Sequence, residues 1–183
     1  MKNKLQICFS FCFFQALLLL MLPIHWWLGA LFAAVIHEVF HIFAVMLCDG
    51  TIRSVKLSAS GAEIGVMPMS AAKQALCALA GPVGSFLCLF AAEYFPELAV
   101  CGLIQGGYNL LPIYPLDGGR VLRCLCSEPI CIGMERFIMV IITGCSLWLS
   151  ANCAELAVMI LISAWHLMFH RKFSCKEVNL AVQ

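Results

Sequence analysis

Charged residues are what this sequence has least of. Only 11% of its 183 residues are charged and 63% are hydrophobic, whereas a soluble domain is about 25% charged and about 45–50% apolar. The net charge is +1, and no basic cluster is large enough to indicate nucleic-acid binding. This composition excludes an ordinary soluble domain and is typical of a polytopic membrane protein.

A paired-cysteine pattern is also missing. The chain holds 12 cysteines but no C-x-x-C pair, and the spacing of the closest two, Cys124 and Cys126, suits no common zinc site. Most of the others, such as Cys8, Cys77 and Cys145, lie inside apolar runs. We therefore expect small packing residues and no disulfide framework.

Long apolar runs, by contrast, are plentiful. A transmembrane helix needs about 20 apolar residues, and the candidates cover residues 5–22, 26–48, 74–95, 98–116, 131–150 and 153–169. Lys2 and Lys4 precede the first run as in a signal peptide, but no small-x-small cleavage site follows, so we expect a retained helix. The predicted fold class is an all-α polytopic membrane protein with about six transmembrane helices.

The positive charges predict the orientation of these runs. With a cytoplasmic N-terminus, all 11 Lys and Arg residues fall in cytoplasmic segments, and the outer loops hold acids such as Glu93 and Glu97. Because cytoplasmic loops are enriched in Lys and Arg, we predict that both termini are cytoplasmic. On that side, residues 51–67 alternate β-branched and polar side chains around Gly61. This pattern favours a small β-hairpin over an ordinary loop.

A metal-binding pattern lies inside the second run. Residues 37–41 read His37-Glu38-Val39-Phe40-His41, which is H-E-x-x-H. Residues four apart share one helix face, so both histidines can bind one metal ion, and Glu38 beside them can take a proton from water. The alternative is a hydrogen-bonded pair of packing residues. Ionisable side chains are costly in lipid, which favours a functional site.

A third ligand is needed, because catalytic zinc sites usually have three from the protein. Asp117 is the candidate, in a stretch where Pro112 and Pro115 interrupt helical hydrogen bonding. Unwound backbone at membrane depth is tolerated only against protein or a water-filled cavity. Asp117 could instead be a helix-terminal turn residue. Two geometries stay open: the 112–120 stretch dips inward as broken helix, or Arg120 snorkels outward from a buried position.

These motifs together resemble a known family. The chain carries H-E-x-x-H at 37–41, Ala80-Gly81-Pro82 next, and N-x-x-P-x-x-P-L-D-G-G-R from Asn109 to Arg120. In this order they resemble the site-2 protease family (peptidase family M50) of intramembrane zinc metalloproteases. The layout is most similar to the branch typified by the bacterial stage IV sporulation protein FB. The resemblance covers about residues 25–125, which would be the catalytic core.

The resemblance implies a role for each motif. His37, His41 and Asp117 would bind one Zn²⁺ ion, and Glu38 would be the general base that later protonates the leaving amine. Asn109 would help to hold the substrate backbone, although an interhelical hydrogen bond is the alternative. Residues 51–67 would take substrate by strand addition. The segment at 80–85 would either pack closely against a neighbouring helix or unwind the third run.

The expected protein is thus a single membrane-embedded metalloprotease domain over 1–183. Two further helices would follow at 131–169, with a short basic cytoplasmic tail at 170–183. By family analogy it would lie in a bacterial cell membrane and cleave a membrane-tethered protein, such as a transcription-factor precursor, near the cytoplasmic leaflet. Regulatory membrane proteins would be its other partners, and no nucleic acid is expected.

Two other functions compete with this one. A catalytically inactive zinc-binding membrane scaffold of the same fold would not need Glu38, which is present. A metal transporter would need ionisable residues along its whole path, but the outer half of the predicted bundle has almost none. His166 and His170 are also four apart, but no Glu lies between them. We expect them to be interfacial residues.

Overall fold

The structure is a computed structural model in which the described residues are 4–58 and 61–150, with only the backbone described at 4–5 and 146–150. The predicted run at 153–169, with His166, and the tail at 170–183, with His170, lie outside these residues. The chain forms two compact units, residues 1–110 and residues 111–183.

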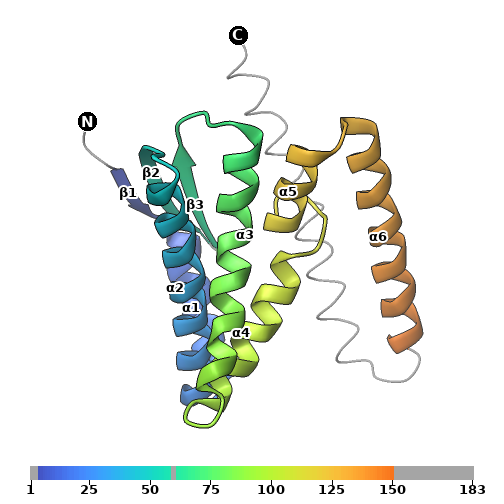
Figure 1. Ribbon diagram of the computed structural model, residues 1–183. Coiled ribbons are helices and arrows are strands. Elements are labelled where there is room, and N and C mark those ends of the chain that lie inside the picture. Colours follow the sequence, from blue (N-terminus) through green and yellow to red (C-terminus); the bar gives the residue numbers. More distant parts are fainter. Residues whose placement is uncertain (1–3, 59–60, 151–183) are drawn as a thin grey trace. The chain divides into compact units, whose positions relative to one another are not determined.

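The first unit combines helices with a small sheet (Figure 1). Its elements are β1 (Lys4–Ile7), α1 (Phe9–Met21), α2 (Ile24–Leu47), β2 (Ile52–Ser58), β3 (Gly61–Val66), α3 (Ala71–Leu87), the 3-10 helix η1 (Cys88–Ala91) and α4 (Pro96–Asn109). The second unit contains α5 (Asp117–Leu125) and α6 (Glu128–Ser150). The predominantly helical fold class is confirmed.

Two segments of the described chain are long and apolar enough to cross a membrane. They are α2, with 24 residues, and the 21-residue segment Ala71–Ala91 formed by α3 and η1. Helix α1 has 13 residues, so it is about 20 Å long, which is shorter than the hydrocarbon core of about 30 Å. The prediction of about six membrane-spanning helices therefore stays a prediction.

Two predicted helical runs have different bounds in the structure. The run predicted from residue 5 begins as strand β1, and its helix starts only at Phe9. The run predicted over 98–116 is helical only as far as Asn109. Both corrections have a local cause. Lys4-Leu5-Gln6-Ile7 alternates polar and apolar residues, and Pro112 cannot donate the hydrogen bond that a continuing helix would need.

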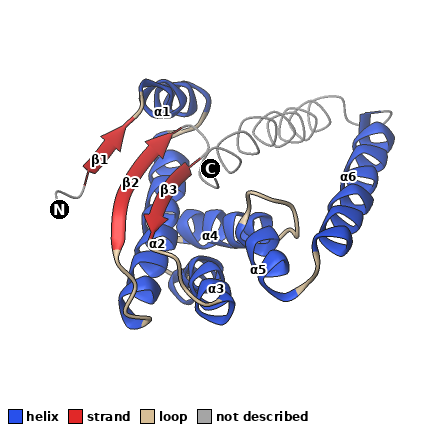
Figure 2. Cartoon of the chain, turned by 90° about the horizontal axis from the view of Figure 1, so that it is seen from above, coloured by secondary structure: helices blue, strands red, loops and turns tan. Residues whose placement is uncertain are grey.

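The small sheet lies beside the ends of α1 and α2 (Figure 2). Strands β2 and β3 pair antiparallel, with Val55 opposite Ile64, and Gly61 at the turn has a φ of +112° that favours glycine. The hairpin predicted over 51–67 is thereby confirmed. Strand β1, which was not predicted, pairs parallel with β2, with Leu5 opposite Val55. The strand order β1-β2-β3 leaves β1 and β3 at the edges.

Small side chains line the inner faces of α2, α3 and α4. The buried residues of α2 recur at every fourth position, at Gly29, Ala33, His37, His41 and Val45. The buried residues of α3 are Ala75, Cys77, Ala78, Gly81, Pro82, Gly84 and Ser85, and those of α4 are Ala99, Gly102 and Gly106. Such residues allow helix backbones to approach closely, as they do in membrane bundles.

Two glycines show how close this approach is. A Cβ atom added to Gly102 on α4 would lie 2.6 Å from the carbonyl oxygen of Ser85 on α3. One added to Gly29 on α2 would lie 2.9 Å from the carbonyl carbon of Glu97 on α4. Neither position could hold a side chain unless a helix moved, so both glycines are required by helix contact.

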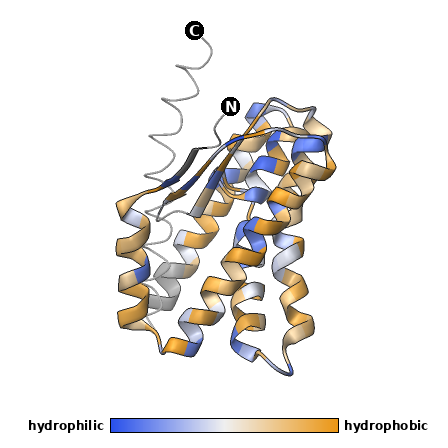
Figure 3. Ribbon diagram, turned by 90° about the vertical axis from the view of Figure 1, so that its left-hand side faces the viewer, coloured by the Kyte–Doolittle hydropathy of each residue, from blue (hydrophilic) through white to orange (hydrophobic). Residues whose placement is uncertain are grey.

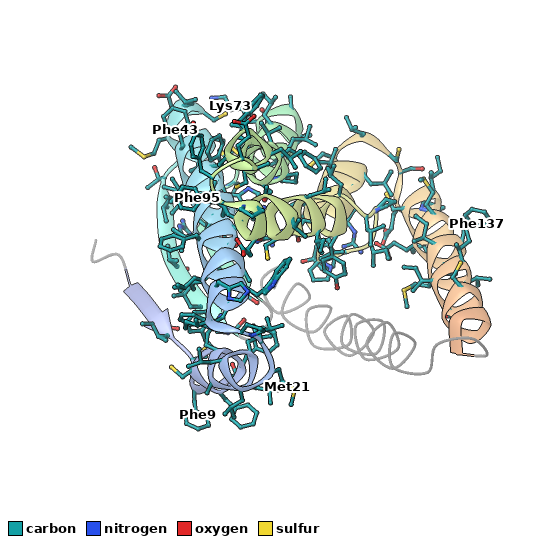
Figure 4. The ribbon with its side chains drawn as sticks, turned by 90° about the horizontal axis from the view of Figure 1, so that it is seen from below. Phe9, Met21, Phe43, Lys73, Phe95 and Phe137 are labelled. Atoms are coloured by element: carbon teal, nitrogen blue, oxygen red, sulfur yellow. The ribbon has the colours of Figure 1, made fainter. Side chains whose placement is uncertain are left out.

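Large apolar side chains lie on the outside of the helices. Phe9 is 85% exposed and Phe90 is 86% exposed, and Figure 4 shows Phe9 and Phe43 pointing away from α1 and α2. Figure 3 shows mostly hydrophobic residues along the helices, whereas the strands mix hydrophilic and hydrophobic ones. Small residues inside and large apolar residues outside form the distribution expected when the surrounding solvent is lipid.

Candidate metal centre

The two histidines of the H-E-x-x-H motif meet on the buried stripe of α2. His37 is 2% exposed and His41 is 9% exposed. Their Nε2 atoms are 3.1 Å apart, and their rings are nearly perpendicular, at 83°. The prediction that both histidines share one helix face is therefore confirmed, and one nitrogen of each ring points to the same position.

The other nitrogen of each ring is held by α3. His41 Nδ1 lies 2.7 Å from the carbonyl oxygen of Cys77, and His37 Nδ1 lies 2.8 Å from the hydroxyl oxygen of Ser85. A carbonyl can only accept a hydrogen bond, so Nδ1 of His41 carries the proton and donates it. Its Nε2 atom then keeps a lone pair, which is the form of imidazole that binds metals.

This arrangement fits a tetrahedral zinc ion. Zinc binds imidazole nitrogen at about 2.0–2.1 Å, which puts two such nitrogens about 3.3 Å apart in tetrahedral geometry. The Nε2 atoms of His37 and His41 are separated by 3.1 Å, so a small rotation of either ring would suffice. Histidine ligands usually donate their second nitrogen to a carbonyl or another acceptor. Cys77 and Ser85 provide such partners.

The same distance also allows a hydrogen bond between the histidines, as in the packing alternative. That bond requires a proton on Nε2 of His37, because Nε2 of His41 has none. Ser85 would then have to donate to Nδ1 of His37 rather than accept from it. The tautomer of His37 is therefore the feature that differs between a metal centre and a structural pair.

Gly81 brings α3 into contact with the histidines. A Cβ atom added there would lie 2.7 Å from Nε2 of His37 and closer still to the ring of His41. Helix α3 continues unbroken from Ala71 to Leu87 with Pro82 inside it. Of the two roles left open for residues 80–85, close packing is therefore confirmed and unwinding is wrong. Close packing is favoured because both glycines of this segment face α2, where Gly84 accommodates the ring of Phe40.

Ser85 is a site residue that sequence reasoning missed. It is fully buried, and it lies 48 residues after His37, so no local pattern connects the two. The only sequence signal was its position at the end of the Ala80–Ser85 segment. Glu38, which directly follows His37, is half-buried.

Asp117 and Asn109 mark the two ends of the broken stretch. Asn109 is the last residue of α4 in the first unit, and Asp117 is the first residue of α5 in the second. Asp117 is buried, at 5% exposed, whereas the side chain of Arg120, 4.0 Å from its carboxylate, is 46% exposed. Residues 110–116 form no regular helix. The break therefore lies before Asp117, because residues 117–120 already belong to α5. The choice between an inward dip of this stretch and a snorkelling Arg120 stays open.

Comparisons with known proteins show similarity in both sequence and fold. The chain is 26% identical over 110 residues to a zinc metalloprotease of Methanocaldococcus jannaschii, an alignment that covers 52% of this chain and 32% of the relative. It also superposes on the solved structure of a site-2 protease from the same organism with a TM-score of 0.64 and 20% identity. That match covers 92% of this chain and 89% of the solved one.

This chain has the fold of a site-2 protease. The similarity extends well beyond the motifs, because it includes nearly the whole chain. At the level of sequence, the chain spans about a third of the length of the curated relative it matches. No protein-family model matches the chain. The similarity to the sporulation branch stays a prediction.

Proposed function

We propose that this protein is an intramembrane zinc metalloprotease of the site-2 protease family that hydrolyses a peptide bond of a membrane-tethered protein. The observation that supports this most is the histidine pair of α2, with both Nδ1 atoms held by α3 and both Nε2 atoms facing each other. The similarity to a zinc metalloprotease and to a site-2 protease fold supports the same reaction class.

The proposed ligand set is His37, His41 and Asp117, which would supply two imidazole nitrogens and one carboxylate oxygen. Two imidazoles and one carboxylate are a common ligand set for catalytic zinc, with a fourth position left open. A single Zn²⁺ ion bound there would polarise the carbonyl group of the scissile peptide and make water more acidic. In this proposal, Ser85 and the Cys77 carbonyl keep the two imidazoles in the orientation that metal binding needs.

Glu38 is the proposed catalytic residue. Its carboxylate takes a proton from the attacking water while the water oxygen forms a bond to the peptide carbonyl carbon. When the C–N bond breaks, Glu38 passes the proton to the leaving amine, so the carboxylate is regenerated. Asn109 is the proposed substrate-binding residue, because its side-chain amide can both donate to and accept from an extended backbone.

The position of the histidines supports cleavage near one leaflet. His41 lies six residues before the end of α2, which corresponds to about 9 Å along the helix. The sheet adjoins this end, with Arg53 and Lys56 on β2 and Lys73 in the first turn of α3. The Lys73 ammonium donates a hydrogen bond to the carbonyl of Cys48, just after α2, at 2.8 Å. By the positive-inside rule this is the cytoplasmic end of α2. The edge strand β3 lies at the same end, where it could accept an extended substrate by strand addition.

The proposal extends to location and partners. The protein would lie in a bacterial cell membrane with both termini in the cytoplasm, as the distribution of Lys and Arg favours. Its substrate would be a membrane-tethered protein, for which a transcription-factor precursor is the family analogy. Membrane proteins that gate access to the site would be further partners.

Comparative proteomics with a Glu38→Gln variant tests the reaction. Membrane fractions from cells with wild type, Glu38→Gln and Glu93→Gln are compared for shortened forms of membrane-tethered proteins. Glu93→Gln is the matched control, because it makes the same substitution at an exposed position. We expect a fragment that is present with wild type and the control and absent with Glu38→Gln, while purified Glu38→Gln keeps its zinc.

Two results would contradict the proposal in different ways. If Glu38→Gln produces the fragment as fast as wild type, the role of Glu38 is wrong. If wild type binds one zinc ion but no fragment depends on Glu38, the protein is better described as the zinc-binding scaffold.

A further inference from the structure

Glu135 on α6 is an unusual residue for its position. It is a carboxylate within a helix that is otherwise largely apolar, and it is 1% exposed, which puts it among the most buried large side chains of the described chain. Transferring a charged group out of water is costly unless it is paired and hydrogen-bonded. An ionisable residue in a membrane helix is therefore expected to have a function.

Glu135 joins two segments of the second unit. Its Oε1 atom accepts a hydrogen bond from the backbone N–H of Tyr114 at 3.2 Å, and it pairs with the Nη2 atom of Arg123 at 3.3 Å. The guanidinium carbon of Arg123 lies 3.9 Å from the centre of the Tyr114 ring, which adds a cation–π contact. The three residues thus form a closed cluster, the Tyr114–Arg123–Glu135 cluster.

Two residues of the cluster flank Asp117 in the sequence. Tyr114 comes three residues before Asp117, and Arg123 comes six residues after it on the same helix, α5. The backbone between them is compact, because Leu116 N–H donates to the carbonyl of Ile113 at 2.9 Å. A Cβ atom on Gly119 would lie 2.5 Å from that carbonyl oxygen. The start of α5 therefore cannot shift without disturbing the segment that Glu135 holds.

We infer that Glu135 is a positioning residue that, through Tyr114 and Arg123, fixes the start of α5 and with it the carboxylate of Asp117. This inference rests on the proposed function, in which Asp117 is a zinc ligand. Glu135 touches neither metal nor substrate in this role. Glu135 reduces the number of positions that the Asp117 carboxylate can take. Zinc affinity is then higher, because the carboxylate loses less conformational entropy when zinc binds.

Glu135→Gln separates positioning from simple stabilisation. The amide keeps the size of the side chain and an oxygen that accepts from Tyr114, but it removes the charge that pairs with Arg123. Loss of a supporting partner in a metal site lowers metal affinity by about 10–100-fold, and we expect a loss of about 10-fold in zinc retention against a chelator. Glu128→Gln, at an exposed position in the first turn of the same helix, is the matched control and should retain zinc like wild type.

The double variant Arg123→Gln/Glu135→Gln provides the rescue. Arg123→Gln alone leaves the buried Glu135 without its cation and should lower zinc retention as much as Glu135→Gln does. Together the two substitutions give a neutral pair of amides, so zinc retention should recover by at least about 3-fold over either single variant, as expected for coupled residues. If Glu135→Gln does not fold, Arg123→Lys is used, which keeps the charge but loses the planar stacking on Tyr114.

The measurements are zinc retention and melting temperature of purified protein, together with substrate cleavage. A folded Glu135→Gln protein, or the replacement Arg123→Lys protein, with wild-type zinc retention would overturn the inference, even if its melting temperature were lower. That result would leave the proposed function intact. Conversely, zinc loss in Glu135→Gln with no cleavage by wild type would support the inference and refute the proteolytic function. A wild-type protein that binds no zinc would refute both.

Discussion

Replacing Gly81 by alanine should separate α3 from the histidine pair. The added Cβ atom would lie 2.7 Å from Nε2 of His37, whereas real Cβ atoms essentially never approach closer than 3.0 Å. Its contact with the ring of His41 would be closer still. Neither ring can turn away freely, because Nδ1 of His37 is hydrogen-bonded to Ser85 and Nδ1 of His41 is hydrogen-bonded to the carbonyl of Cys77. Helix α3 must therefore retreat.

The size of the effect follows from these distances. A retreat of about 1 Å would stretch both Nδ1 hydrogen bonds beyond about 3.2 Å, the usual upper bound for such bonds. Overpacking a helix contact costs about 1–3 kcal/mol. Loss of the partners that orient metal ligands lowers metal affinity by about 10–100-fold. We expect Gly81→Ala to lower the melting temperature and to lose zinc at least about 10-fold faster to a chelator.

Gly107→Ala on α4 is the control for this experiment. No described atom lies within 4 Å of the Cβ that it would add, and alanine is favoured over glycine in a helix by about 1 kcal/mol. This variant should be as stable as wild type or slightly more so. Purified proteins would be compared by thermal unfolding with and without zinc and by competition with a chelator. If Gly81→Ala matched Gly107→Ala in both assays, the close contact between α3 and the histidines would be wrong.

Three further outcomes test other parts of the structure. Ser85→Ala removes the partner of His37 Nδ1 and should lower zinc retention by about 10-fold; retention equal to wild type would show that Ser85 does not orient the ring. Removing zinc with a chelator should lower the melting temperature of wild type but not of His41→Ala, because zinc stabilises only a protein that retains its ligands. If the melting temperatures of both proteins fell equally, the metal would bind elsewhere. Glu63→Gln breaks the exposed cross-strand ion pair with Lys56, in which Nζ and Oε2 are 3.9 Å apart. The free energy of unfolding, measured with a denaturant, should change by less than about 1 kcal/mol. A larger change would mean that this ion pair stabilises the hairpin more than its exposure indicates.

The features that could be predicted from sequence are the local ones. His37 and His41 meet because they are one helical turn apart, and the 52–66 hairpin follows from alternation around Gly61. The interruption around Pro112 and Pro115 follows from two prolines that cannot continue a helix, although α4 ends earlier than predicted, at Asn109. Each of these depends only on residues within a few positions of one another, where periodicity and backbone chemistry are sufficient.

The features that were missed depend on distant partners. Ser85 reaches His37 across 48 residues, and Leu5 pairs with Val55 of a strand that forms far along the chain. Glu135 was not singled out, since its partners Tyr114 and Arg123 come from an irregular stretch and a different helix. A sequence pattern shows that such residues are polar or extended, but their partners are decided only by packing.

Every fourth residue of α2 from Gly29 to Val45 is buried, and this spacing determines which neighbouring helix each part of α2 faces. An α-helix turns by about 100° per residue, so each step of four residues advances the buried stripe by about 40° around the axis. The stripe therefore faces different neighbours along its length: Gly29 contacts Glu97 of α4, and the histidines contact α3. A single residue inserted between Ala33 and His37 would rotate one half of α2 by about 100° against the other. Either the contact with α4 or the contact with α3 would then be lost, so the length of α2 between these residues is as strictly determined as the identity of the histidines.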